Sequence, residues 1–458
     1  MGVRRRWIPL LAAALVAGCG GSPDRVPPAG DRARFGPDAL RYDLRLTHTE
    51  HRLTGTERIA FRNPFARPLR HVWIRAWDNA FGSCARPPIR VRATDGARIG
   101  ARRRGCTAYR LDLATPVAPG NRGAVTLAIA VAPPKRFDRF GRLGAIDVLG
   151  NALPVLAVSE RGAEPSLPPY TFAGEAFFSL VADWRVKLTH APGELVASTG
   201  QEVAATGNTV SLAADDERDF TLVVGPMERT QRDAAGIRIR WFAPRGTGAR
   251  EARAGLAIAA RGLTALQRDL GPYGARELDV LDAPPDVAKG GIAMEYPQLV
   301  LSPAFAPALV HELGHQWFFR LVGNDEWAAP WLDETLTSFA AMRLGRAVHG
   351  PDRLRGCVQR TRRARPPAPV DSDMGTLERR PGRAVRDTLY IEGPCALFNL
   401  QRRIGADRMT AFLRGLVDRH RDGVLTTAEL RAALERLPTG PRAVRELRLS
   451  LDPSIPPG

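Results

Sequence analysis

The feature that most constrains this chain is the pair His311 and His315, with Glu312 directly after the first histidine. Residues four apart share one face of a helix, so both imidazoles can reach a single divalent cation while Glu312 lies beside it. We therefore predict a helix over 303–320 that carries part of a metal site. The alternative at this stage is an ordinary helix with two surface histidines.

A third ligand is required, because a catalytic zinc takes three protein ligands and keeps one position open for water. Glu334 is the candidate: residues 316–333 allow the first helix to end at the Gly-Asn pair 323–324 and a second helix to start at Pro330. The second helix would bury Leu332, Leu336, Phe339, Ala340 and Leu344. The sequence thus predicts one Zn²⁺ per chain, held by His311, His315 and Glu334.

This spacing, together with Trp331-Leu332-Asp333-Glu334, resembles the gluzincin metallopeptidases, and among them the aminopeptidase N and leukotriene-hydrolase family of zinc peptidases. The resemblance implies an α+β multidomain chain. An N-terminal antiparallel, saddle-like β domain would be followed by a thermolysin-like α/β catalytic domain that ends in short helices. It also implies zinc-dependent aminopeptidase activity on peptide substrates with a free N-terminus.

An upstream element extends the resemblance. Ala293, Met294 and Glu295 match the core of the family's Gly-Ala-Met-Glu-Asn element, with Tyr296 where many members carry asparagine. By resemblance these three residues bind substrate, and the Glu295 carboxylate binds its free α-amino group. Such an ion pair in a closed site discriminates against blocked termini. Pro297 cannot donate a ladder hydrogen bond, which suits an edge strand beside which a peptide could pair.

Two catalytic roles follow. Glu312 would take the proton of the attacking water and pass it to the leaving amine. Tyr390 stands in a segment that resembles the family's Tyr-x-Lys-Gly element, with Glu392 in place of the usual lysine, and the resemblance implies that its hydroxyl donates to the oxyanion. Asp333 and Thr337 are candidate partners of the ligands, although surface capping is equally open for Asp333.

Other function classes stay open on the sequence alone. One is an exported zinc endopeptidase, or a hydrolase of a non-peptide substrate on the same fold. Another is a binding lipoprotein that has kept zinc and lost catalysis. Hydrolysis of amino-acid arylamides, compared with that of N-blocked peptides, separates these classes.

The N-terminus indicates export. A basic start at 4–6 precedes a short apolar run at 8–17, and the sequence Val16-Ala17-Gly18-Cys19 is typical of a bacterial lipobox. We predict a signal peptide at 1–18, lipidation of Cys19 and a tether at 19–37. The protein would then be anchored by lipid to the outer face of the cell membrane, or lie in the periplasm or on the outer membrane. An ordinary secretory signal is the alternative.

The remaining cysteines are even in number, in a compartment where disulfides persist. Pairing along the chain predicts two bonds, Cys84 with Cys106 and Cys357 with Cys395. Since none of them forms a Cys-x-x-Cys motif, a thiolate metal site is not expected.

Charge points to no nucleic-acid partner. The formal net charge is +18, but the basic residues are almost all arginine and are dispersed, which indicates a compositional bias of the source genome. Contact of the arginines with anionic lipid near the anchor is the less favoured interpretation.

The segment 418–429 nearly fits a calcium-binding loop, but His420 stands at a position that needs an oxygen ligand. We instead expect Thr426 to cap the last helix and Glu429 to complete a capping box.

The pattern along the chain gives the expected domains. Short apolar alternations predict a β domain at 38–228, and helix- and strand-like patterns predict an α/β domain at 229–400 and a short helical segment at 401–458. The resemblance implies that the domain at 229–400 is thermolysin-like. Within the second domain we expect strands at 236–242, 278–281 and 293–301 and a helix at 249–270. Terminal helices are expected at 388–404, 406–419 and 428–437.

Overall fold

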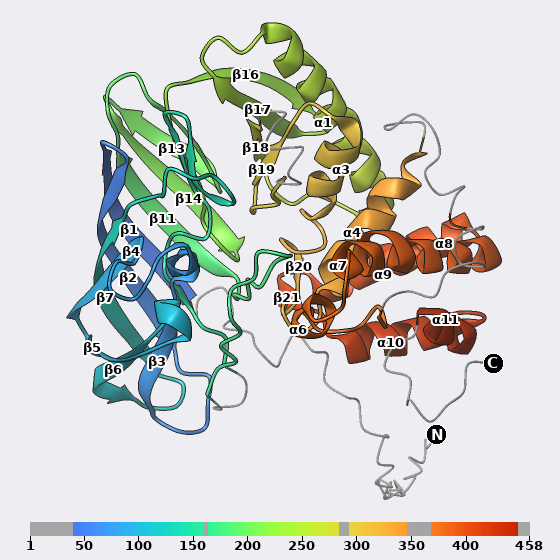
Figure 1. Ribbon diagram of the computed structural model, residues 1–458, viewed down its shortest axis with the longest axis horizontal. Helices are drawn as coiled ribbons and strands as arrows, with labels where there is room; N and C mark the ends of the chain where they lie inside the picture. The colour runs from blue at the N-terminus through green and yellow to red at the C-terminus, as the bar shows by residue number, and fades with distance from the viewer. Residues whose placement is uncertain (1–39, 160–163, 284–292, 346–356, 358–367, 448–458) are drawn as a thin grey trace, which may run out of the picture.

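The computed structural model describes residues 40–159, 164–283, 293–345, 357 and 368–447. The predicted signal peptide, the tether and Cys19 lie outside these residues. The described chain forms a β-rich part, followed by a part in which a small sheet is covered by helices (Figure 1). This arrangement confirms the predicted fold class, an N-terminal β domain followed by a helical, thermolysin-like domain.

The largest sheet of the first part has the strand order β13-β14-β11-β1-β2-β7-β4. Neighbouring strands pair antiparallel, except that β1 and β11 run parallel. Buried and more exposed residues alternate along β1, so one face packs on the core and the other faces solvent. The strands are β1 (Leu40–Thr49), β2 (Arg52–Arg62), β4 (Ile89–Asp95), β7 (Arg122–Val131), β11 (Ala182–Thr189), β13 (Gln201–Thr206) and β14 (Thr209–Glu217).

Two smaller sheets complete this part, in the orders β10-β3-β6-β5 and β12-β15-β9-β8. The first consists of β3 (Leu69–Arg75), β5 (Ala97–Arg103), β6 (Ala108–Val117) and β10 (Val155–Leu156). The second consists of β8 (Phe140–Leu143), β9 (Ile146–Leu149), β12 (Leu195–Ser198) and β15 (Leu222–Gly225). In the shared core Tyr42 stacks on Trp184, with ring centroids 4.0 Å apart. The expected Cys84–Cys106 disulfide is formed.

The second part is built on the sheet β16-β17-β18-β19, formed by β16 (Met227–Ala234), β17 (Ile237–Pro244), β18 (Glu277–Asp282) and β19 (Leu299–Ser302). The strands β17, β18 and β19 run parallel, and β16 is antiparallel to β17. Helix α1 (Ala249–Leu270) occupies the predicted range and packs on β17. A Cβ atom at Gly255 would overlap the Trp241 ring, so the contact requires glycine there.

The predicted strand at 293–301 is wrong in its extent. The chain turns at Gln298, which has a φ of +57°, so that β19 begins only at Leu299. Residues before the turn fold back against β19, and Met294 forms an isolated antiparallel bridge with Leu301. The element with the Ala-Met-Glu sequence is therefore a short segment along the outer edge of β19.

The predicted helix at 303–320 is also too long. Helix α3 covers Ala306–Gly314 and ends before the chain reaches β20 (Val322–Gly323), with Phe319 at a φ of +131°. Gly323 does not terminate a helix; its missing side chain leaves room for the guanidinium of Arg218 from the β domain. Helix α4 (Trp331–Arg343) starts after Pro330 as predicted, and all five of its expected core residues are buried.

Helices complete the chain: α6 (Met374–Glu378), α7 (Ala384–Asp387), α8 (Gly393–Ile404), α9 (Ala406–His420), α10 (Thr427–Glu435) and α11 (Gly440–Leu447). Thr388–Glu392, before α8, form the π-helical turn η6, where we had expected regular α-helix. The Thr426–Glu429 capping box is present, and β21 (Gly423–Val424) pairs with β20 inside the segment that resembled a calcium loop. Cys357 and Cys395 are bonded, as expected.

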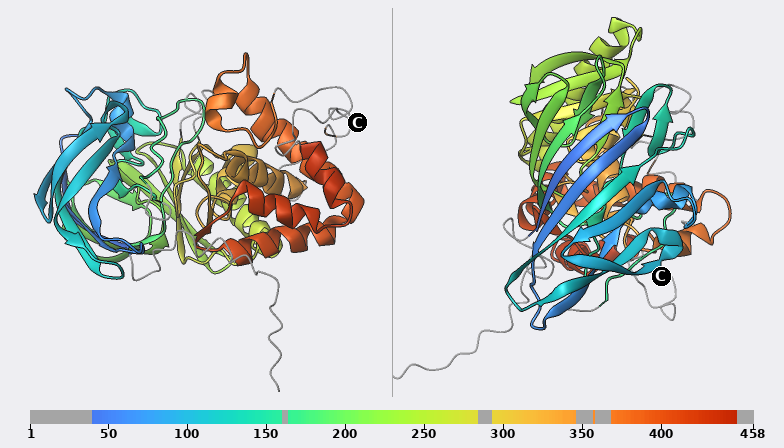
Figure 2. Two further views of the ribbon diagram at one scale, coloured as in Figure 1. Left: turned by 90° about the horizontal axis from the view of Figure 1, so that it is seen from below. Right: turned by 90° about the vertical axis from the view of Figure 1, so that its left-hand side faces the viewer.

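The two parts lie side by side in Figure 1 and in the left-hand view of Figure 2. At their contact the buried Arg320 side chain donates hydrogen bonds to both carboxylate oxygens of Glu217, and Arg218 donates to the carbonyls of Arg320 and Leu321. None of the helices in the described ranges is long and apolar enough to cross a membrane.

Candidate active site

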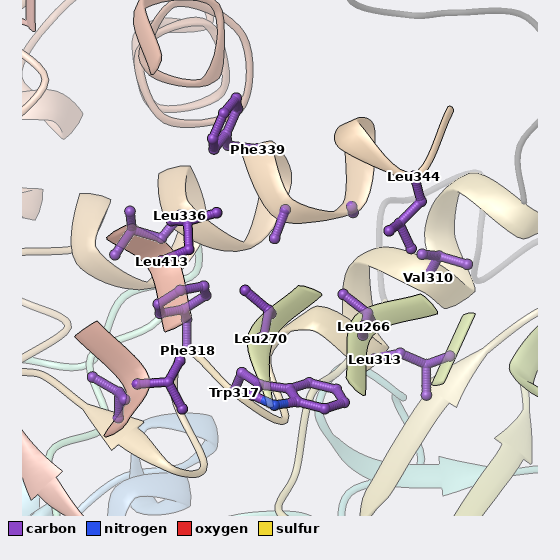
Figure 3. Packing of buried hydrophobic residues seen from close by; sticks show 14 of the residues in the cluster. Leu266, Leu270, Val310, Leu313, Trp317, Phe318, Leu336, Phe339, Leu344 and Leu413 are labelled. Carbon is purple, nitrogen blue, oxygen red and sulfur yellow. The ribbon is translucent and has the colours of Figure 1, made fainter. Parts of the chain in front are cut away.

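Helices α3 and α4 place the residues of the site, and a shared apolar core holds these helices in register. Figure 3 shows the side chains of this core: Leu266, Leu270, Val310, Leu313, Trp317, Phe318, Leu336, Phe339, Leu344 and Leu413. They come from α1, α3 and the turn after it, α4 and α9. A Cβ atom at Gly314 would lie 3.0 Å from a Thr337 methyl, so the glycine allows α3 to approach α4 closely.

Three donor atoms converge between these helices. The Nε2 atoms of His311 and His315 are 3.1 Å apart, and Oε2 of Glu334 lies 3.2 Å from the first and 3.5 Å from the second. The two imidazole rings stand nearly perpendicular, at 88°. The structure thus brings together the three residues that the sequence spacing selected: His311 from α3, His315 from the C-cap of that helix, and Glu334 from α4.

The contacts of Nδ1 show which nitrogen of the His315 ring can act as a ligand. Nδ1 lies 2.5 Å from Oδ1 of Asp333 and 3.1 Å from the carbonyl of Phe318, so it carries the proton and donates. Thr337 lies at the same nitrogen. Nε2 therefore presents a lone pair toward His311 and Glu334, as a metal ligand must.

This donor set fits zinc. Lone pairs of two imidazoles only 3.1 Å apart repel each other, so the cluster needs a positive charge on or between its donors. Burial tends to lower the pKa of His315, but Asp333 and Glu334 outweigh it and hold that pKa well above the ordinary value. Burial tends to raise the pKa of Glu334, yet His315 and His311 depress it. Two nitrogens and a carboxylate oxygen are ligands that Zn²⁺ prefers.

Two further carboxylates border the histidines. One oxygen of Glu295, one of Glu312 and a nitrogen of His315 all lie within 4.8 Å of one another. Burial, helped by the neighbouring acids, raises the pKa of both carboxyl groups well above the ordinary value, with His315 opposing it. The segment that carries Ala293 and Met294 therefore places Glu295 beside His315 and Glu312.

Tyr390 approaches from the π-helical turn η6. Its hydroxyl donates a hydrogen bond to Oε1 of Glu334, and its ring centroid is 5.7 Å from that of His311. Burial, followed by the carboxylates of Glu334 and Glu175, raises its pKa well above the ordinary value. The hydroxyl is therefore neutral and can donate. The turn is fastened by Thr335, whose hydroxyl donates to the carbonyl of Leu389.

Sequence reasoning missed the acids that other segments contribute. Glu175, on a loop of the β domain, lies 3.1 Å from Arg139, and burial together with Glu334 raises its pKa to about 7 against the effect of Arg139. Glu326 accepts a hydrogen bond from the Phe177 amide, and one of its oxygens lies within 4.8 Å of oxygens of Glu295 and Asp333. Neither residue stands in a periodic pattern or motif, so nothing in the sequence marked them.

A His-Glu-x-x-His pair with a glutamate from the next helix, on this two-part fold, resembles the sites of gluzincin-type metallopeptidases. The comparisons agree with that class: residues 303–449 match the model of the peptidase family M1 domain. A crystal structure of an M1 zinc metallopeptidase from Deinococcus radiodurans superposes with a TM-score of 0.67, at 21% identity over 92% of this chain and 96% of the other. A two domain M1 zinc metallopeptidase variant bound to L-arginine gives a TM-score of 0.65 at 20% identity, over 93% and 96% of the two chains.

Curated relatives match over shorter stretches. Aminopeptidase B of Rattus norvegicus is 35% identical over 88 residues, which are 18% of this chain and 13% of that protein. Leucine aminopeptidase 2 of Ajellomyces capsulatus is 25% identical over 221 residues, 43% of this chain and 35% of that protein. The chain thus matches about an eighth to a third of these relatives. Residues 303–449 thus match the peptidase family M1 domain, and the chain as a whole shares the fold of the two-domain M1 zinc metallopeptidases.

Proposed function

We propose that this protein is a zinc aminopeptidase that removes N-terminal residues from peptides with a free amino terminus. The observation that carries the proposal is the convergence of His311, His315 and Glu334, with the carboxylates of Glu295 and Glu312 beside the imidazole of His315. A metal-binding trio alone would fit many hydrolases. A carboxylate oxygen of Glu295 lies within 4.8 Å of a ring nitrogen of His315. This separation favours an enzyme that binds the amino terminus of the substrate next to the scissile bond.

In this proposal His311, His315 and Glu334 hold the metal. When bound, Zn²⁺ lowers the pKa of a coordinated water toward neutrality and polarises a scissile carbonyl. Asp333 keeps the His315 proton on Nδ1 and so keeps Nε2 available for coordination.

Glu312 acts as the general base. It accepts the proton of the attacking water and passes it to the leaving amine, which requires a carboxylate beside the ligands rather than among them. Tyr390 supplies a neutral hydroxyl for the oxyanion, releasing its hydrogen bond to Glu334 in order to do so.

Glu295 pairs with the substrate's α-ammonium group, and the backbone of Ala293 and Met294 runs alongside the bound residue. Met294 already exchanges two hydrogen bonds with Leu301, at 3.0 and 2.8 Å, so this segment is held in extended conformation at the edge of β19. Because this segment is already ordered, less conformational entropy would be lost when the substrate binds.

We further propose that the chain is a lipoprotein with a signal peptide at 1–18, a lipidated Cys19 and a tether at 19–37. The β domain would extend over 38–228, the peptidase domain over 229–400 and the helical segment over 401–458. Two disulfides in the fold suggest an extracytoplasmic location. The proposal predicts that radiolabelled palmitate is incorporated by the wild type and not by Cys19→Ser.

The deciding experiment combines zinc content with hydrolysis of amino-acid arylamides and of matched N-acetylated peptides. The proposal expects about one zinc per chain and hydrolysis of the arylamides only. Glu312→Gln should keep the zinc and lose turnover, and more than a tenth of wild-type activity in this variant would remove Glu312 from its role. Preferred cleavage of the N-acetylated peptides would instead favour an endopeptidase.

A further inference from the structure

The position of Glu295 is not explained by regular secondary structure. Its segment is joined to β19 by the bridge of Met294 with Leu301 and by a hydrogen bond from the Leu299 amide to the Tyr296 carbonyl, and the chain turns sharply three residues after Glu295, at Gln298. A carboxylate that selects the substrate amine must nevertheless stay at one distance from the metal ligands. Some other contact must therefore hold the segment in place.

Gln316 makes that contact. It follows His315 directly, is completely buried, and uses both ends of its side-chain amide. Its Nε2 donates to the carbonyl of Tyr296 at 3.1 Å and to that of Glu295 at 3.4 Å, and its Oε1 accepts from the Gln298 amide at 2.9 Å. The Gln316 side chain thus makes hydrogen bonds both to residues before the turn and to Gln298 at the turn.

The β domain holds the same segment from the other side. Gln298 donates to Glu217 at 2.6 Å, and Glu217 is itself fixed by Arg320. Thr199 donates to the Pro297 carbonyl at 2.8 Å, and the Tyr296 hydroxyl donates to the Arg139 carbonyl at 2.6 Å. These contacts fix the segment to the β domain. Gln316 instead fixes it to the chain directly after His315.

We propose that Gln316 is a positioning residue that sets the distance between the Glu295 carboxylate and the metal-ligand imidazole of His315. Through this contact it controls how strongly the enzyme selects a free amino terminus. The link is short, because one side chain joins the neighbour of His315 to the carbonyl of Glu295 itself. The inference rests on the proposed aminopeptidase function, in which Glu295 binds the substrate's ammonium group.

The test measures the contribution of the amine without turnover. L-leucine hydroxamate and its desamino analogue, 4-methylpentanohydroxamate, differ only in the amino group, so the ratio of their inhibition constants reports the Glu295 contact. We would measure this ratio for the zinc-loaded wild type, Glu295→Ala, Gln316→Met and the double variant. Gln267→Met is a matched control: Gln267 also bridges a carbonyl (Ala235) and an amide (Tyr273), but at the end of α1.

The inference expects the amine preference to fall about tenfold or more in Gln316→Met, the size of a lost hydrogen bond to a charged group, and to stay within twofold of wild type in Gln267→Met. The preference in the double variant should equal that of Glu295→Ala, because the two residues act on one contact. A Gln316→Met preference within twofold of wild type would overturn the inference, as would a further loss in the Glu295→Ala background.

A folding defect is controlled by zinc content and melting temperature. If Gln316→Met does not fold, Gln316→Glu replaces it, since the carboxylate keeps an acceptor for Gln298 and turns a second acceptor toward the Tyr296 and Glu295 carbonyls. The same tenfold loss is expected, and an unchanged preference refutes the inference. A wild type that binds both hydroxamates equally refutes the proposed aminopeptidase function itself, and this outcome is distinct from a failure confined to Gln316.

Discussion

Replacing Asp333 by asparagine tests how the site holds its metal. The Asp333 side chain is 1% exposed, and its Oδ1 lies 2.5 Å from Nδ1 of His315. Asparagine has nearly the same shape and keeps an acceptor oxygen, but it removes the negative charge. His315 then keeps its orientation and loses the electrostatic support for its role as a ligand.

The expected magnitude follows from the type of hydrogen bond. A bond to a charged group contributes about 1.5–3 kcal/mol and a neutral one about 0.5–1.5 kcal/mol, so the change costs about 1–1.5 kcal/mol. At 1.4 kcal/mol per tenfold, the zinc dissociation constant should rise about fivefold to tenfold. This estimate agrees with the lower end of the roughly 10–100-fold losses that follow when partners of metal-bound histidines are removed.

The assay is equilibrium dialysis against a zinc chelator at fixed pH, with bound metal measured by atomic emission. Asp373→Asn is the matched control, because Asp373 is also a hydrogen-bonded aspartate of this domain but caps α6 through Thr376. Its zinc affinity should equal that of the wild type. An Asp333→Asn affinity within twofold of wild type would refute the argument that Asp333 supports the ligand electrostatically.

Three other outcomes are expected. Glu312→Gln should lower kcat by about 10²–10⁴ while zinc stays bound. Tyr390→Phe should lower kcat about a hundredfold with little change in KM, in steady-state arylamide assays; a change confined to KM would argue against oxyanion donation. In the β domain, burial tends to lower the pKa of His48, but Asp147 and Glu194 outweigh it and raise that pKa. Its ion pairs therefore stabilise the fold fully below about pH 6.5 and lose effect as the pH rises through the folded pKa, so His48→Gln should lower Tm more at pH 6 than at pH 9.

Several features could be predicted because they depend on residues close in sequence. The i, i+4 spacing puts His311 and His315 on one helical turn, and the apolar periodicity of 249–270 matches α1 residue for residue. The capping box of Thr426 and Glu429 is likewise a local hydrogen-bond pattern. In each case the geometry of one turn decides the outcome, and distant contacts change little.

Features that depend on distant contacts were missed. Helix α3 stops at Gly314, and the His315 ring that follows is held by Asp333 of the next helix. The 293–301 segment breaks at Gln298, whose amide bonds to Gln316 instead of continuing a strand ladder. Propensity and periodicity contain no information about either partner.

The sequence by itself determined which residues could bind a metal. The spacing selected His311, His315 and Glu334, because a helix, a turn and a second helix bring the glutamate back to the face that carries the two histidines. Only the tertiary structure decided what surrounds them. Glu175, on a β-domain loop, interacts with Glu334, and Gln316 joins the Ala-Met-Glu segment to the chain directly after His315. These contacts depend on how two domains pack, because a buried amide or carboxylate takes its partner from whichever segment the fold brings within hydrogen-bond distance.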